Sequence, residues 1–137
     1  MVFNAHNLAI INLVVQLLLI LVVFAAAYLA KIRKKFGIHC KILRIIVPIQ
    51  IVLILVAMLP SMLGFIENRQ LGWLINTEML VHHSLGAIII LLWLFIILKF
   101  KGIIKMRIRL VILMRTTFIL WIVVFILGVH LYTFLWL

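Results

Sequence analysis

The chain alternates four long apolar runs with short polar connections. The apolar runs extend from Leu8 to Ala30, from Arg44 to Ile66, from Met79 to Phe100 and from Leu110 to Leu135. Each run is close to the ~20 residues that a helix needs to cross the ~30 Å hydrocarbon core of a bilayer. The pattern therefore predicts an all-α integral membrane four-helix bundle, with helices at about 8–30, 44–66, 79–100 and 110–135, forming a single transmembrane domain over residues 1–137.

The composition agrees with this class and gives no sign of catalysis. Of the 137 residues, 69% are hydrophobic and 11% are charged, whereas soluble domains are about half apolar and about one quarter charged. The one cysteine, Cys40, excludes an intrachain disulfide. No nucleophile, carboxylate pair or phosphate-binding glycine loop is arranged for chemistry, so no catalytic residue is predicted and a non-enzymatic role is favoured.

The placement of the charges predicts the topology. The net charge is +11, and all but one of the basic residues lie in or beside two turns: Lys31, Arg33, Lys34, Lys35, Lys41 and Arg44 in the first, and Lys99, Lys101, Lys105, Arg107, Arg109 and Arg115 in the second. Arg69 and both acids, Glu67 and Glu78, lie on the other side. The positive-inside rule then places both turns in the cytoplasm and both termini outside a cell membrane that the chain crosses several times. Basic turns beside anionic headgroups indicate lipid contact and no nucleic-acid role.

Several polar residues within the runs predict local structure. Asn12 and Gln16 lie four residues apart, on one face of the first helix, and are expected to point inward. Phe36 and Gly37 are expected to break the chain between the first two helices. Asn76 or Thr77 is expected to cap the third helix, whose inner side is predicted to carry His83, Gly86, Ala87, Ile90, Leu94 and Ile97. Trp73 is expected to anchor the chain at the membrane surface, and Gln50 to point inward from the second helix.

Four of the five histidines, His6, His82, His83 and His130, are expected near the outer membrane surface, and His39 at the cytoplasmic face. Because the two faces are ~30 Å apart, any shared site must lie within one leaflet. His82 points about 100° away from His83 on a helix, so the two cannot serve one site equally. Glu78 lies one turn before His82, so the two side chains are expected to bond. His130 is expected on the side opposite the stripe formed by Thr117, Trp121, Gly128 and Tyr132, facing headgroups or another subunit.

The histidines are compatible with three interpretations, so the sequence does not identify the cofactor. One outer b-type haem could be held by His83 or His82 together with His130 or His6. A second, inner haem would need Met106 or Met114 as an additional ligand beside His39. A copper site could be built from His82, His83, His6 and Met79, because imidazole and thioether suit copper. Alternatively, no cofactor is bound and the histidines bond headgroups, water or backbone.

Three segments resemble a family of small four-helix membrane proteins associated with haem-copper oxidase maturation, the CtaM/YozB-like proteins. They are Gly37–Leu43, with the sequence GIHCKIL, His82–Ile88, with HHSLGAI, and Leu120–Tyr132, with LWIVVFILGVHLY. His39 and His83 look like the family's histidines at the starts of the second and third helices. The family histidine expected before the last helix is absent, since Met106 and Arg107 occupy that region.

The resemblance implies a role in assembling or accompanying a terminal oxidase. The expected function is a non-catalytic accessory or assembly subunit of a membrane redox complex, whose partners are the lipid bilayer and other membrane subunits. Two alternatives remain open. One is a small cytochrome b with one outer-leaflet bis-histidine haem transferring electrons near quinone. The other is a cofactor-free structural subunit of a large membrane complex, such as a copper-dependent monooxygenase.

Overall fold

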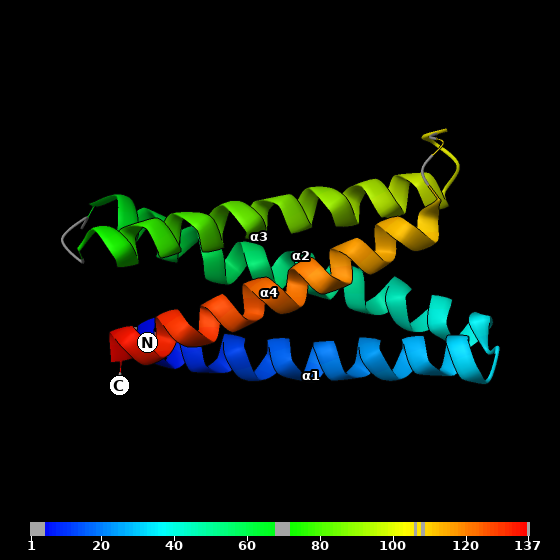
Figure 1. The fold of residues 1–137 in the computed structure, drawn as a ribbon, viewed down its shortest axis with the longest axis horizontal. Coiled ribbons are helices and arrows are strands. Elements are labelled where there is room, and N and C mark those ends of the chain that lie inside the picture. Colours follow the sequence, from blue (N-terminus) through cyan, green and yellow to red (C-terminus); the bar gives the residue numbers. More distant parts are fainter. Residues whose placement is uncertain (1–4, 68–71, 106, 108, 137) are drawn as a thin grey trace. The chain divides into compact units, whose positions relative to one another are not determined.

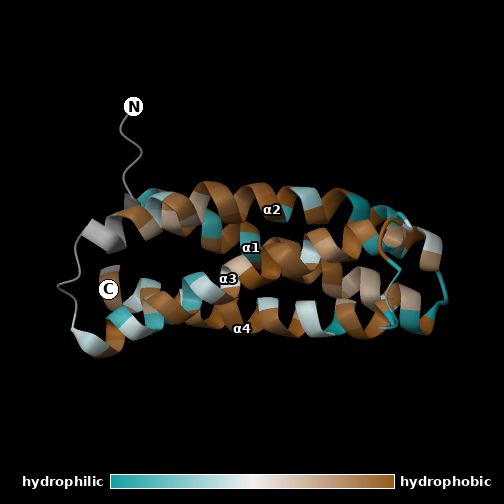
Figure 2. Cartoon of the chain, turned by 90° about the horizontal axis from the view of Figure 1, so that it is seen from above, coloured by the Kyte–Doolittle hydropathy of each residue, from teal (hydrophilic) through white to brown (hydrophobic). Residues whose placement is uncertain are grey.

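The computed structural model describes residues 5–67, 72–105, 107 and 109–136, and these residues form four long α-helices. The helices are α1 (Ala5–Ile32), α2 (Phe36–Glu67), α3 (Trp73–Phe100) and α4 (Leu110–Trp136) (Figure 1). Each contains an apolar stretch of 26 to 28 residues that is long enough to cross a membrane. Figure 2 shows hydrophobic residues over most of the length of each helix. The all-α class with four candidate membrane spans is confirmed, and the chain is a multi-pass membrane protein.

Three helices begin earlier than the apolar runs predict, α1 by three residues and α2 and α3 by more. The second helix begins at Phe36 instead of Arg44, and the third at Trp73 instead of Met79. The prediction that Phe36 and Gly37 break the chain is wrong, because both belong to the first turn of α2. The break lies just before them, at Lys34, which adopts the left-handed conformation with φ 51°. Hydropathy identifies only the part of a helix that crosses hydrocarbon, whereas the backbone remains helical in the polar interface.

The ends of α3 are set by two glycines that flank it. At the C-terminus, Gly102 has φ 73°, and its N–H bonds the carbonyl of Lys99 while the N–H of Ile103 bonds the carbonyl of Leu98. This pair of bonds is a Schellman motif, which needs a left-handed residue that glycine adopts without strain. At the N-terminus the capping position is Gly72, with no side-chain hydrogen bond.

The expected cap of α3 at Asn76 or Thr77 is therefore wrong. Both residues lie inside the helix, which begins at Trp73. The Thr77 hydroxyl donates to the carbonyl of Trp73, 2.8 Å away and four residues earlier. A threonine within a helix commonly bonds the backbone in this way.

The chain divides into two compact units, residues 1–57 and residues 58–137. The prediction of one transmembrane domain stays a prediction. In the first unit, Gln50 of α2 donates from Nε2 to Oε1 of Gln16 in α1 at 2.8 Å, and Gln16 donates to Asn12 at 3.5 Å. Gln50 is 1% exposed and Gln16 is buried. The inward orientation predicted for Gln16 and Gln50 is confirmed, whereas Asn12 is half-buried.

In the second unit, α3 and α4 pack against each other as a helical hairpin. The buried residues of α3 recur every three or four positions: Ile75, Met79, His83, Gly86, Ile89, Trp93 and Ile96. Those of α4 include Leu113, Thr117, Trp121, Val124 and Leu131. Trp93 and Trp121 meet edge to face, with ring centroids 6.3 Å apart. His83 and Gly86 lie on the buried side of α3 as predicted, but Ala87 and Leu94 are exposed.

Candidate functional site

The two adjacent histidines of α3 occupy different surroundings. His83 is buried at 6% exposure, and its Nδ1 lies 2.7 Å from the carbonyl oxygen of Met79. Because a carbonyl only accepts, Nδ1 carries a proton and donates it to this hydrogen bond. The His82 ring lies nearly perpendicular to the His83 ring, with centroids 5.5 Å apart. This arrangement agrees with the prediction that the two side chains point in different directions.

The His82 imidazole packs against α4 at a glycine. A Cβ atom placed on Gly128 would lie 3.0 Å from His82 Cε1, closer than ordinary van der Waals contact. The absence of a side chain at position 128 therefore makes room for the imidazole on α4.

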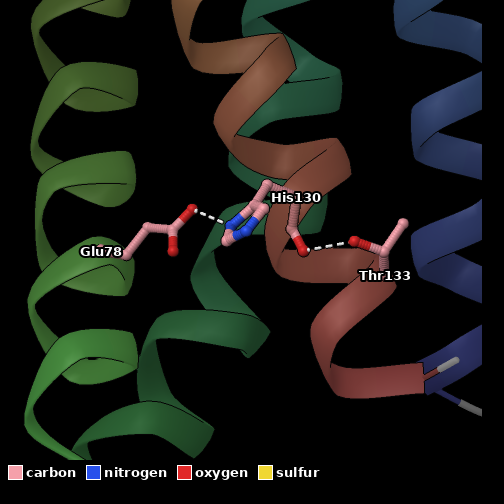
Figure 3. Close-up of polar contacts among 3 residues, drawn as sticks. All are labelled: Glu78, His130 and Thr133. Carbon is pink, nitrogen blue, oxygen red and sulfur yellow. Dashed lines mark hydrogen bonds and ion pairs between the residues drawn. The ribbon is translucent and has the colours of Figure 1, made fainter.

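A polar contact between two side chains also joins α3 and α4. Glu78 Oε1 accepts a hydrogen bond from His130 Nδ1 at 2.7 Å, as Figure 3 shows. The Thr133 hydroxyl donates to the His130 carbonyl at 2.8 Å, on the side away from Glu78 (Figure 3). The Glu78 side chain is 18% exposed, whereas the His130 side chain is 63% exposed. The pair thus presents an imidazole to the surroundings, oriented by a carboxylate that is mostly shielded.

This pair differs from the sequence prediction in two respects. Glu78 is expected to bond His82, but its Oε1 bonds His130 on the other helix. His130 is expected on the side of α4 opposite the helix contact, yet it lies at the edge of that contact and remains exposed. Both residues immediately precede buried stripe residues, Met79 and Leu131. The pair could have been predicted from one signal: each polar residue lies next to a buried position, and the two helices are antiparallel neighbours.

A shallow, mostly apolar groove lies against the Glu78–His130 pair. Its apolar walls come from Trp73, Leu74, Ile75 and Val81 of α3 and from Phe134 of α4, and Thr77 contributes a hydroxyl. Trp73 is 76% exposed at the helix start, which agrees with the expected surface anchor. The groove therefore combines an apolar surface with an ionisable pair, both formed by residues 73–134 of the second unit.

The other candidate ligands lie elsewhere. His6 lies in the first turn of α1, in the first unit, and is half-buried. Met79 is buried in an apolar cluster with Ile75 and Leu131. His39 lies in α2 near its start, half-buried as expected for a residue at one end of a span. Of the two alternative ligands for a second haem, Met106 lies outside the described residues and Met114 lies half-buried near the start of α4.

The haem and copper predictions can be compared with the positions of the described residues. Among them, no group of three or more histidine, cysteine, aspartate or glutamate side chains could hold a metal ion. His83 is buried, whereas His130 lines the open groove with its Nδ1 held by Glu78. The two nominated haem ligands therefore face different surroundings within the second unit. The haem and copper readings stay predictions.

Comparison of the chain with protein-family models, curated proteins and solved structures finds no match. Evidence on function therefore comes from the residues of the chain itself.

Proposed function

We propose that the chain is a non-catalytic accessory or assembly component of a membrane redox complex of the terminal-oxidase type. The observation that carries the proposal is the contact between two of the segments that resemble the oxidase-maturation family. His82 opens the segment His82–Ile88, and its ring packs against Gly128 of the segment Leu120–Tyr132. These segments therefore meet at one surface of the α3–α4 pair, as expected if the resemblance reflects a shared functional surface.

The proposed topology places both termini outside and both basic turns in the cytoplasm. Four crossings return the chain to the side on which it began, so the two termini share a side. The basic residues concentrate in the α1–α2 and α3–α4 turns, and cytoplasmic turns carry such an excess. In this orientation the Glu78–His130 pair lies at the outer leaflet.

Copurification tests the accessory role. The tagged chain, solubilised from its native membrane in a mild detergent, should retain subunits of a haem-copper oxidase, and its deletion should reduce assembled oxidase. The His82→Ala variant should retain fewer oxidase subunits and should support less oxidase assembly, because it lacks the ring at the contact between the two segments. Leu91→Ala is the control, since Leu91 is exposed on the same helix and lies outside the two segments. Normal oxidase assembly in the deletion strain would refute the role, and copurification with another membrane complex would favour the structural-subunit alternative.

A small cytochrome b is the second candidate, and the hydrogen bond of His83 favours it. Histidines that bind metal commonly donate their other ring nitrogen to a carbonyl or carboxylate, which fixes the ring. The Nδ1 contact of His83 with the Met79 carbonyl has this form. If a haem is present, His83 and either His82 or His130, which belong to the same unit, are the proposed ligands.

A reduced-minus-oxidised visible spectrum with iron and copper analysis separates the two candidates. A sharp haem band with about one iron per chain would establish the cytochrome. His83→Ala should then remove the band, whereas His39→Ala should leave an outer site intact. Equal loss in both variants would refute the placement of the site in one leaflet, and a blank spectrum without metal would eliminate the cytochrome.

A further inference from the structure

The groove beside the Glu78–His130 pair has two chemical parts. Its walls are apolar and partly aromatic, formed by Trp73, Ile75 and Val81 of α3 and by Phe134 of α4. Its polar part is the carboxylate–imidazole pair, joined at 2.7 Å. A ligand that matches both parts has a flat apolar ring and one hydrogen-bonding group.

The depth of the pair suits an amphiphilic headgroup. Glu78 lies five residues after the start of α3 and His130 six residues before the end of α4. At 1.5 Å per residue these positions are roughly 8 and 9 Å from the helix ends. The two residues therefore lie at matching distances from the ends of antiparallel helices, as expected for a pair near one membrane surface.

With Nδ1 bonded to Glu78, Nε2 is the ring nitrogen of His130 that can meet a ligand. The Glu78 carboxylate accepts from His130 Nδ1, so a neutral His130 ring offers the lone pair of Nε2 to its surroundings. A lone pair accepts a hydrogen bond from a hydroxyl. The exposed position of His130 makes this ring edge accessible from the groove that it lines.

We propose that this groove binds the ring of a quinol, whose hydroxyl donates to His130 Nε2 while the ring lies against Trp73 and Phe134. Glu78 acts as a positioning residue that fixes the orientation of the imidazole. A phospholipid phosphate fits less well, because the groove contains a carboxylate and, among its lining residues, no lysine or arginine to neutralise a phosphate. Quinol binding here is independent of the accessory role, and no electron or proton transfer is assigned to the groove.

Equilibrium retention in nanodiscs tests the site. The full chain is reconstituted in neutral-lipid nanodiscs and titrated anaerobically with a short-tailed radiolabelled benzoquinol. Retention above that of empty discs should saturate near one quinol per chain. His130→Ala should weaken this binding at least tenfold, and Glu78→Ala should weaken it while Glu78→Gln, which retains an acceptor for Nδ1, restores much of it.

A steric variant and a surface variant complete the design. Val81→Trp should fill the groove without removing either polar group, and should also abolish saturable retention. Ser84→Ala, on an exposed neighbouring position, should bind like the unmodified chain, and helical content measured by circular dichroism confirms folding of every variant. Equal retention by all variants, or by empty discs, would show that the quinol only partitions into the membrane, and would overturn the proposal. Displacement of the quinol by added phosphatidylglycerol would overturn it in favour of an anionic lipid site.

Discussion

The His82 imidazole occupies the space that a side chain at Gly128 would need. A Cβ on Gly128 would lie 3.0 Å from His82 Cε1 and 3.8 Å from each ring nitrogen. Small residues at helix contacts allow close approach in membranes, where van der Waals packing drives association. Here the close approach is that of an imidazole to a helix backbone, so the two positions should be coupled energetically.

Gly128→Val should destabilise the protein by about 1–3 kcal/mol, the usual effect of overpacking a filled space. His82→Ala should relieve that clash, so the double variant Gly128→Val/His82→Ala should lose less stability than the sum of the single variants. The free energy of unfolding in detergent, measured by denaturant titration, gives this coupling. Gly37→Ala is the control, because a Cβ there meets nothing within 4 Å. Additive effects of the two substitutions would contradict the contact.

The Gln16–Gln50 contact should behave as a coupled pair inside the first unit. Gln16→Leu leaves the Gln50 amide without its 2.8 Å acceptor, and should reduce stability by about 0.6–1.7 kcal/mol, the range for hydrogen bonds between membrane helices. Gln16→Leu/Gln50→Leu should be closer to neutral, because replacing both partners removes the unsatisfied group. Thermal unfolding in detergent measures both effects. Asn12→Leu should have a smaller effect, since its contact with Gln16 is 3.5 Å long; an equal or larger effect would show that the amide pair is not the main contribution.

The spans were predictable because each depends on local composition. An uninterrupted apolar run of about 20 residues has few alternatives to a membrane helix, and the four helices follow the four runs. The inward orientation of Gln16 and Gln50 was also accessible from the sequence, since both are isolated polar residues in apolar runs; their contact with each other was not predicted. The early start of α2 at Phe36 could not be predicted in this way, because polar residues such as His39 and Lys41 carry no hydropathy signal for a helix.

The buried face of α3 was harder to predict because the helix is apolar on every side. Ala87 and Leu94 are expected inward and are exposed, whereas Ile89 and Trp93 form the buried stripe. The Glu78–His130 pair was missed for a related reason. It joins residues 52 positions apart, and its formation depends on the rotation and register of two helices, which a one-dimensional pattern does not specify.

Trp93 should contribute to stability through its contact with Trp121. Edge-to-face aromatic pairs contribute about 0.5–1.5 kcal/mol beyond area burial, and Trp93 is 2% exposed. Trp93→Leu should therefore lower the free energy of unfolding by at least that amount, because it also removes buried volume. Trp73→Leu is matched in chemistry but changes an exposed residue, so its effect should be close to zero. Equal losses in denaturant titrations of the two variants would contradict a specific contribution from the aromatic pair.

Cysteine labelling in intact cells should determine the orientation of the chain. Asn68 lies outside the described residues, between α2 and α3, and Asn68→Cys in a Cys40→Ser background should react with a membrane-impermeant maleimide added outside. The unmodified chain, whose one cysteine is Cys40 near the start of α2, should react only after the membrane is permeabilised. The reason is the excess of lysine and arginine in the turns, which cytoplasmic connections carry. Labelling of Cys40 from outside, with protection of the cysteine introduced at position 68 until permeabilisation, would reverse the orientation. It would also move the Glu78–His130 pair to the cytoplasmic leaflet, while the quinol-binding test in nanodiscs would be unaffected because both faces are accessible there.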